Sequence, residues 1–261
     1  MLREISTLKG MTVGALDGEI GSVHDVYFDA QHWTVRYFVV DTGTWLSGRR
    51  VVISPLSLKS PADVAGDRLN VGLTKAQIEQ APSWDTAKPV SRQHEIAYAR
   101  YYDYPYYWTG PARWGLGWDP LTGVQPVPSP DPVEEEILAR ERESTDVHLQ
   151  SARDVVGYYV QAADDDVGHV EDFLVDDRSW AIRYIVVDTR NWLPGRRVVI
   201  SPRWIKTVSW DESRVLVDLL RSQVETAPEY DPDAALERAL ESRLHEHYRR
   251  PTYWDEEAPR R

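Results

Sequence analysis

Hydrophobic positions early in the chain fall into short runs that are rich in β-branched and aromatic side chains. These runs cover residues 12–16, 21–29, 33–41, 50–54 and 68–71. Such a composition is typical of β-strands. Asp17-Gly18, between the first two runs, is a strong signal for a two-residue hairpin. The pattern predicts five or six short strands in a small barrel or sandwich.

The same pattern occurs a second time further along the chain. Residues 33–59 align with residues 180–206 at a shift of 147, and 18 of these 27 positions are identical. The shift then becomes 146, and the match continues until residues 107–108 align with residues 253–254. The chain therefore contains an internal repeat. Each copy includes its predicted strands and also the helical and aromatic segments that follow them.

The repeat divides the chain into four segments. We expect a first repeat with a helix and an aromatic tail, a proline-rich acidic linker, a second such repeat and a C-terminal tail, at residues 1–108, 109–148, 149–254 and 255–261. Four prolines between Pro126 and Pro132 predict that this part of the linker is extended. The acidic residues after Asp131-Pro132 predict the start of a short helix.

Each repeat carries a helical signal after its strands. Thr74 is the expected N-cap of a helical turn that ends before Pro82. A later helix in repeat one is expected to begin near Ser91. In repeat two, Asp231-Pro232 predicts a helix start. Leucines recur there at every fourth residue and form an apolar stripe, at positions 236, 240 and 244.

Composition and charge exclude several classes of protein. The net charge of −12 argues against a nucleic-acid binder and against attraction to an anionic membrane. The chain has no cysteine, which excludes disulfides, thiolate metal sites and a cysteine nucleophile. No apolar run has the length of a signal peptide or of a membrane span of roughly 20 residues. We therefore expect a cytoplasmic protein without a membrane span.

Three blocks of repeat one, residues 21–29, 33–41 and 51–55, resemble the PRC-barrel family. That family includes the cytoplasmic domain of the photosynthetic reaction-centre H subunit and the C-terminal domain of the ribosome-maturation factor RimM. The tandem arrangement with Tyr-Trp tails is similar to stand-alone bacterial members. The resemblance covers about residues 5–80 and 152–226. It implies a mainly β fold with short α-helices, in which two small PRC-type β-barrels stand in tandem, each with a C-terminal helix and an aromatic tail.

Each repeat has two adjacent arginines where the loop after its central predicted strand leads into the next strand. Two guanidinium groups are suited to bidentate binding of a carboxylate or phosphate. In the simpler interpretation, neighbouring strand residues point to opposite faces, so that one arginine pairs with a local aspartate and the other is solvated. The candidate interaction surface comprises Arg49, Arg50, Arg196, Arg197, Asp41 and Asp188.

Catalytic and metal-binding patterns are absent from the sequence or poorly spaced. No histidine of one repeat matches a histidine of the other; the seven are His24, His32, His94, His148, His169, His245 and His247. No serine-histidine-acid spacing, phosphate loop or dinucleotide glycine pattern occurs. The run Asp164–Asp166 lacks the EF-hand spacing and is expected to be a hairpin tip. We therefore expect no enzymatic activity, no cofactor and no metal site.

The aromatic tails are the most unusual feature of the sequence. Residues 98–108 contain six tyrosines and a tryptophan, and such side chains suit an interface. We expect each tail to cover a barrel, so that the repeats form an intramolecular pseudo-dimer sealed by the tails. A site for an outside partner is the alternative. The candidate sealing residues are Tyr102, Tyr107, Trp108, Tyr248, Tyr253 and Trp254.

These observations favour a non-enzymatic adaptor that binds a protein partner of unknown identity. A further homodimer is left open. One alternative is a regulatory protein that binds a small ligand or an ion at the arginine pairs. A second alternative is a ribosome- or RNA-associated factor, which the resemblance to RimM suggests and the net charge of −12 opposes.

Overall fold

A computed structural model describes residues 1–58, 64–83, 90, 92–108, 149–189, 196–234 and 236–257, with Ala65 described by its backbone only. The predictions for the linker at residues 109–148 lie outside the described residues. Among the described helices, none has both the length and the apolar character needed to cross a membrane.

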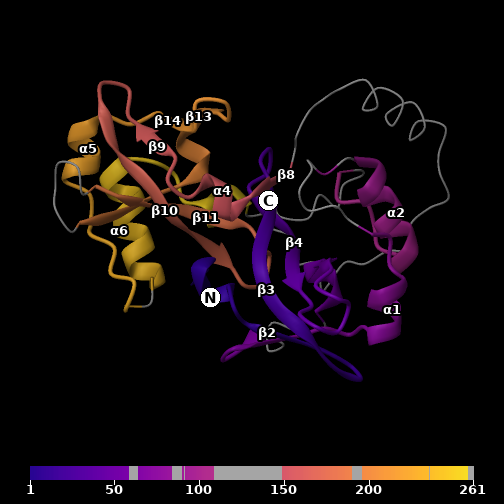
Figure 1. Cartoon of the computed structure of the whole chain (residues 1–261). Helices are drawn as coiled ribbons and strands as arrows, with labels where there is room; N and C mark the ends of the chain where they lie inside the picture. Colours follow the sequence, from indigo (N-terminus) through magenta and orange to yellow (C-terminus); the bar gives the residue numbers. More distant parts are fainter. Residues whose placement is uncertain are drawn as a thin grey trace. The chain divides into compact units, whose positions relative to one another are not determined.

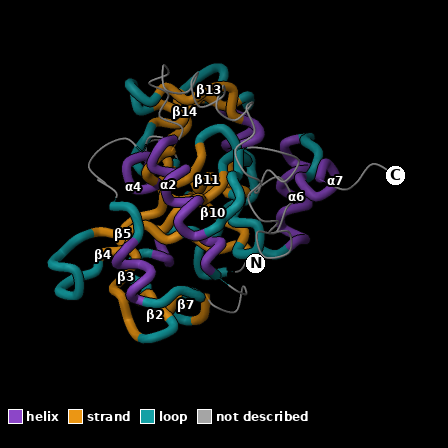
Figure 2. The backbone as a smooth tube through the Cα atoms, turned by 90° about the vertical axis from the view of Figure 1, so that its right-hand side faces the viewer, coloured by secondary structure: helices purple, strands orange, loops and turns teal. Residues whose placement is uncertain are grey.

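The chain folds into two compact units. The repeat-one unit consists of Thr7–Ser151 and Arg178–Trp180. The repeat-two unit consists of Met1–Ser6, Ala152–Asp177 and Ala181–Arg261. Strands dominate both units and the helices are short (Figures 1 and 2). The predicted class, mainly β with short helices, is confirmed.

The repeat-one unit is built on a seven-stranded sheet. Its strands are β2 (Thr12–Ala15), β3 (Gly18–Asp29), β4 (Thr34–Asp41), β5 (Arg50–Ile53), β6 (Val64–Ala65), β7 (Arg68–Asn70) and β8 (Leu149–Ser151). They lie in the order β5-β4-β3-β2-β7-β6, with β8 beside β3. Neighbours are antiparallel except for the parallel pair β2 and β7.

The sheet of the repeat-two unit has the same plan. Its strands are β1 (Leu2–Glu4), β9 (Tyr159–Gln161), β10 (Asp166–Asp176), β11 (Ile182–Asp188), β12 (Arg197–Ile200), β13 (Ile205–Ser209) and β14 (Arg214–Val217). They lie in the order β12-β11-β10-β9-β14-β13, with β1 beside β10. Here β9 and β14 form the parallel pair.

The first strand of each repeat belongs to the sheet of the other unit. Strand β1 pairs with β10 so that Leu2 lies opposite Asp176. Strand β8 pairs with β3 so that Leu149 lies opposite Asp29. These positions match one another at the shift of 147 residues, so the exchange is reciprocal. The repeats found in the sequence and the compact units of the structure are therefore different divisions of the chain.

The central strands β4 and β11 lie in the hydrophobic core. All residues of β4 are buried except Asp41, and all residues of β11 are buried except Asp188. Burying one such apolar side chain, for example Phe38, contributes about 1.5–3 kcal/mol to stability. Each central strand nevertheless contains one buried arginine, Arg36 in β4 and Arg183 in β11. A buried guanidinium must find partners, and these arginines therefore mark a structured polar site.

One glycine in each sheet is required by a close backbone approach. A Cβ atom on Gly21 would lie 1.9 Å from the carbonyl oxygen of Asp41, and one on Gly168 would lie 2.1 Å from that of Asp188. Both glycines have a positive φ, of 145° and 141°. Only glycine fits these positions without a clash, which explains why both repeats have it.

The helices of the repeat-one unit follow the sequence signals. Helix α1 (Lys75–Gln80) begins after Thr74, whose side chain forms a capping box with Gln77. Helix α2 (Arg92–Tyr102) begins where repeat one was expected to become helical. Both predictions are confirmed.

One helix of the repeat-two unit begins at a different residue from the one predicted, so the predicted start at Asp231-Pro232 is wrong. Helix α6 (Arg238–Tyr248) begins six residues after the expected start at Pro232. The Asp231 carboxylate instead accepts the N–H of Asp233 at 3.0 Å, because aspartate stabilises turns as readily as helix starts. The other described helices of this unit are α4 (Ala152–Val155), α5 (Arg221–Glu225), α7 (Tyr253–Glu257) and the 3₁₀ turn Pro202–Trp204. Two further 3₁₀ turns are described elsewhere in the chain, at Ser6–Leu8 and Pro55–Ser57.

Candidate functional site

The first arginine of each pair is used inside its own unit. Arg49 donates from Nη1 to the carbonyl of Glu79 at 3.4 Å and from Nη2 to the carbonyl of Ala81 at 3.2 Å. Arg196 makes the two equivalent hydrogen bonds at the end of α5. The last carbonyls of a helix lack intrahelical partners and attract a cation. These two arginines therefore fix a helix to the sheet.

The second arginine of each pair has different surroundings in the two repeats. Arg197 forms a bidentate ion pair with Glu171, with both N–O distances at 2.6 Å. Its hydrogen bonds to Glu171 raise the pKa of the Arg197 guanidinium. Repeat one has His24 in place of Glu171. For Arg50, no ion pair is found within the described part of the chain.

The aspartates of the predicted surface face the second arginines across the strands. Asp41 lies opposite Arg50 in the β4–β5 ladder, and Asp188 lies opposite Arg197 in the β11–β12 ladder. The Asp41 carboxylate also accepts the N–H of Gly43 at 2.9 Å in the following turn. The structure thus places four of the six predicted residues at two strand ends and turns Arg49 and Arg196 away from them.

A buried carboxylate holds the aromatic tail of the repeat-one unit. Glu95 of α2 has no exposed surface. Its Oε1 atom accepts the hydroxyl of Tyr107 at 2.6 Å and that of Tyr37 at 3.3 Å. Its Oε2 atom accepts Nη1 of Arg92 at 2.9 Å, and the same nitrogen donates to the Tyr107 hydroxyl. A helix, a central strand and the tail thus meet at one carboxylate.

The buried arginine of β4 completes this cluster from the other side. The Arg36 guanidinium lies 3.9 Å from the centre of the Tyr107 ring and 3.0 Å from Oδ2 of Asp29. Burial opposes ionisation of Asp29, but the hydrogen bond from His32 and the charge of Arg36 hold its pKa well below its usual range. The aspartate therefore stays charged and neutralises the buried guanidinium.

The repeat-two unit contains the same cluster. Oε2 of Glu241 accepts the hydroxyls of Tyr184 at 3.1 Å and Tyr253 at 3.0 Å. Arg238 donates to the Tyr253 hydroxyl at 2.9 Å. The Arg183 guanidinium lies 4.1 Å from the centre of the Tyr253 ring. Each of these residues matches the member of the first cluster that has the same role.

The tyrosine hydroxyls of both clusters stay protonated. Burial raises the pKa of Tyr37 and Tyr107 well above the ordinary value, and the nearby Glu95 raises it further. Burial, followed by the charge of its carboxylate partner, raises the pKa of Tyr253 to about 12. Protonated hydroxyls donate hydrogen bonds to a carboxylate. The clusters therefore join a helix, a central strand and the aromatic tail of each repeat through hydrogen bonds between hydroxyls and a carboxylate.

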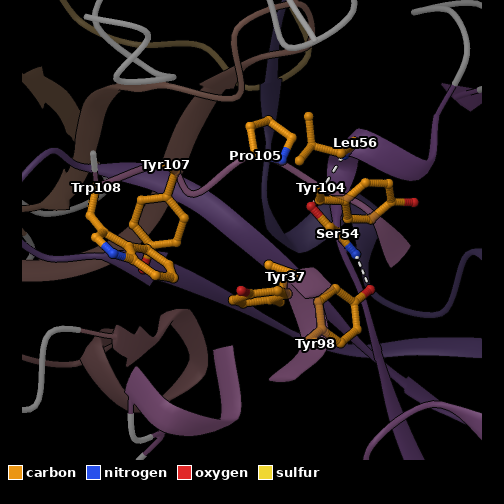
Figure 3. A pocket seen from close by; sticks show the side chains of 9 residues that line it. Tyr37, Ser54, Leu56, Tyr98, Tyr104, Pro105, Tyr107 and Trp108 are labelled. Atoms are coloured by element: carbon orange, nitrogen blue, oxygen red, sulfur yellow. Dashed lines mark hydrogen bonds between the residues drawn. The ribbon is translucent and has the colours of Figure 1, made fainter. Parts of the chain in front are cut away.

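A small pocket adjoins the cluster of the repeat-one unit (Figure 3). The hydroxyl of Tyr98 accepts the N–H of Ser54 at 3.0 Å, as Figure 3 shows, and the Tyr104 and Ser57 hydroxyls lie 3.0 Å apart. The pocket has room for about one water molecule. Its lining residues are Tyr37, Ser54, Leu56, Tyr98, Ala99, Tyr104, Pro105, Tyr107 and Trp108.

The matching region of the repeat-two unit contains larger side chains. Trp204 replaces Ser57, and its ring lies 5.3 Å from that of His245. Nδ1 of His245 donates to the carbonyl of Pro251 at 2.8 Å, and its Nε2 atom lies 3.0 Å from the Tyr184 hydroxyl. Burial lowers the pKa of His245. This histidine is therefore a packed core residue.

The candidate sealing residues make their named contacts with their own repeat. Arg92 lies 4.1 Å from the centre of the Trp108 ring, and Arg238 lies 4.0 Å from that of the Trp254 ring. The remaining two candidates also pack locally, Tyr102 against Tyr98, Tyr101 and Tyr104, and Tyr248 against Trp204 and His247. Each tail thus closes its own repeat. The seal between the two repeats stays a prediction.

The repeat-two unit exposes an aromatic side chain on its sheet. Tyr159 of β9 is 46 % exposed. The ring of His169, opposite it on β10, lies 4.5 Å from the Tyr159 ring, and the Arg214 guanidinium of β14 lies 5.6 Å from it. We call Tyr159, His169 and Arg214 the β9 face. An exposed tyrosine with an arginine beside it is typical of the residues that dominate protein interfaces.

The described residues contain no group of three or more acidic or histidine side chains that is suited to a metal ion. His148 lies outside the described residues. The acidic hairpin tip has a local role, since Asp164 accepts the N–H of Arg221 at 2.8 Å, at the start of α5. Asp17 does the same for Lys75 at 2.7 Å, at the start of α1.

Sequence reasoning missed the buried clusters because charged residues are ordinarily assigned to the surface. The repeat alignment contains the signal that identifies them. Three charged residues of repeat one, Arg36, Arg92 and Glu95, recur unchanged in repeat two as Arg183, Arg238 and Glu241. Identity at matched positions, combined with a position in the middle of an apolar strand, marks Arg36 and Arg183 as buried, whereas Arg92 and Glu95 lie on helix α2 and have only the identity as a signal.

Comparison with known proteins agrees with this architecture. The model of the PRC-barrel domain family matches residues 2–77 and residues 149–224. No match was found among curated proteins. The two matched segments include the exchanged strands β1 and β8, the two central strands and the first residues of helices α1 and α5. They cover more than half of the chain, which therefore belongs to the PRC-barrel domain family.

Proposed function

We propose that this chain is a non-enzymatic adaptor, in which two PRC domains support surfaces that bind a protein partner. One observation carries the proposal: the buried charged and aromatic residues of the two clusters are shared by the repeats and are used in the fold's own contacts, whereas Tyr159 and His169 of the β9 face are replaced by smaller residues in repeat one. Tyr159 and His169 correspond to Thr12 and Ser22, which pair with each other in the same way. A duplicated scaffold with diverged faces is suited to bringing different surfaces together.

The proposal includes the closure of each sheet into the small barrel that gives the family its name. It also includes the absence of catalysis. The acids and arginines buried in the clusters are committed to each other, and the pocket that adjoins the repeat-one cluster has room for about one water molecule. A larger hollow of about 500 Å³ lies beside Arg197 and Tyr230, where Arg197 is paired with Glu171. Arg49 and Arg196 are committed to helix carbonyls. This use removes Arg49 and Arg196 from an anion-binding site, so that the alternative of an anion-binding regulatory protein depends on Arg50 and on Arg197, which is paired with Glu171.

The β9 face provides the test of the adaptor function. The double substitution Tyr159→Thr and His169→Ser gives repeat two the residues of repeat one. In affinity capture at physiological salt, we expect the tagged variant to capture at least about tenfold less of the protein partner than the unmodified chain does. Truncation of a central interface tyrosine has an effect of that size. Melting temperature should stay close to that of the unmodified protein, since both side chains are partly exposed.

The matched control is the reciprocal exchange Thr12→Tyr with Ser22→His in repeat one. This variant keeps the β9 face, and we expect it to retain the partner in full. Equal retention by all three proteins would remove the β9 face from the proposal. Absence of any partner from all of them, together with turnover of a small molecule, would contradict the adaptor function itself.

A further inference from the structure

We propose that residues Leu174–Asp176 of β10 form a docking site for an extended segment of a partner protein, and that β1 occupies this site within the same chain. The inference goes beyond the adaptor function proposed above and does not depend on the β9 face. It rests on the way in which β1 is bound, on the matching strand β8, and on the difference in burial between these two strands.

Backbone hydrogen bonds position β1 along the edge of β10. Arg3 lies opposite Val175 in the antiparallel ladder. The N–H of Ile5 donates to the carbonyl of Phe173 at 2.9 Å, and the N–H of Asp177 donates to the carbonyl of Met1 at 3.0 Å. Main-chain ladders of this kind accept many sequences, and proteins use them to bind extended segments as added strands.

Side chains give the site its selectivity. Leu2 lies opposite Asp176, and two residues later the Glu4 carboxylate accepts the hydroxyl of Tyr230 at 2.9 Å. Strand β8 follows the same plan on β3. It begins with Leu149, and two residues later Ser151 donates its hydroxyl to Asp25 at 2.6 Å.

Both occupants therefore carry a leucine, followed two positions on by a side chain with an oxygen atom that forms a hydrogen bond. The partner segment that fits this site is extended and carries a leucine with a carboxylate or hydroxyl side chain two residues further on.

The three residues of strand β1 are less buried than the first residue of β8, although Ile5, directly after β1, is 2 % exposed and anchors the end of this segment. All three residues of β1 are partly exposed. The first residue of β8, Leu149, is only 4 % exposed. Both exchanged strands have three residues, which is fewer than the about five or six that are usual. When β1 leaves, the backbone groups of Leu174–Asp176 become an unpaired edge, which is a ready template for another strand.

The test compares closed and open forms of the full chain. The double substitution Leu2→Cys with Asp176→Cys places two cysteines directly opposite each other in a protein that otherwise has none. Oxidation fixes β1 in place, and reduction releases it. The substitution Arg3→Pro opens the site, because proline cannot donate to the ladder. The probe is a fluorescent peptide with the sequence Met-Leu-Arg-Glu-Ile-Ser, and the control peptide carries proline at its third position.

We expect the oxidised double variant to bind the probe at least about tenfold more weakly than the same protein after reduction. The Arg3→Pro protein should bind it at least about tenfold more tightly than the unmodified chain, and none of the proteins should bind the control peptide. The single variant Asp176→Cys controls for the loss of the ion pair between Asp176 and Arg183, whose N–O distance is 3.5 Å.

Equal binding by the oxidised and reduced forms would overturn the inference. Absence of binding by a folded Arg3→Pro protein would also overturn it. If this variant does not fold, the comparison of oxidised and reduced forms decides alone. The experiment on the β9 face measures the capture of a protein partner, whereas this one measures the binding of a peptide. A negative result for the docking site can therefore be told apart from a negative result for the adaptor function.

Discussion

The two units share a buried ionic cluster but differ in the space next to it. In the repeat-one unit, Tyr98 and Tyr104 reach the backbone and side chains of a serine-containing turn. In the repeat-two unit, Trp204 replaces Ser57 and His245 replaces Ala99, the residue that follows Tyr98. The rings of Trp204 and His245 pack against each other. The carboxylate, its two tyrosines and its two arginines remain the same. A buried charge has few acceptable replacements, whereas an apolar volume can be filled in several ways.

A second difference concerns the exposure of the shared cluster. The Arg92 side chain is 15 % exposed and its Nη1 atom lies 2.9 Å from Glu95. The Arg238 side chain is 58 % exposed, and its shortest ion-pair distance to Glu241 is 3.5 Å. Water screens the second pair more than the first. The comparison indicates that the cluster of the repeat-one unit contributes more to stability.

Removal of the buried carboxylate should have the largest effect. We expect Glu95→Ala to lower the free energy of unfolding by about 3–5 kcal/mol, because it leaves a buried arginine and two hydroxyls without their acceptor. Glu241→Ala should cost less, since its arginine is better solvated. Urea unfolding of both variants measures the difference. Glu95→Gln is the conservative control and should cost less than Glu95→Ala; an equal loss for Glu95→Ala and Glu241→Ala would contradict the comparison.

Loss of the helix-binding arginine should have an intermediate effect in both units. We expect Arg49→Ala and Arg196→Ala each to lower the free energy of unfolding by about 1–3 kcal/mol, because each leaves two helix carbonyls without a charged donor. The neighbouring Arg50→Ala is the matched control. Thermal unfolding should show little change in melting temperature for Arg50→Ala. A larger decrease for Arg50→Ala than for Arg49→Ala would show that the structural role belongs to Arg50 and not to Arg49.

The smallest effect is a pH dependence confined to the repeat-two unit. Burial lowers the pKa of His245 below its ordinary value of 6.5, so the unfolded chain takes up a proton before the folded one does. His245 therefore contributes stability above pH 6.5, and this contribution is lost as the pH falls from there through the lowered pKa. Repeat one has Ala99 at this position. Hydrogen exchange at pH 7 and pH 5.5 should show faster opening of β11 than of β4 at the lower pH, and His245→Ala should abolish this difference.

Local patterns predicted many of the elements correctly. The runs of β-branched residues gave the strands β2 to β5, and the Thr74 cap gave the start of α1, because these signals act over a few neighbouring residues. Asp231-Pro232 misled the analysis, because the same residues also stabilise turns. The arginine pairs were found by spacing, but their separation into one helix-binding and one strand-end residue depends on a helix some 30 residues away.

The sequence by itself determined the repeat, its family and the main strands of each repeat, because these follow from local patterns that occur twice in the chain. Only the tertiary structure decided that β1 and β8 are exchanged between the units, because three-residue strands carry too little pattern to select their neighbours. It also decided that charged side chains such as Arg36 and Glu95 are buried. A charge is acceptable in a core only when its partners arrive there too, and those partners come from a strand, a helix and a tail far apart in the chain.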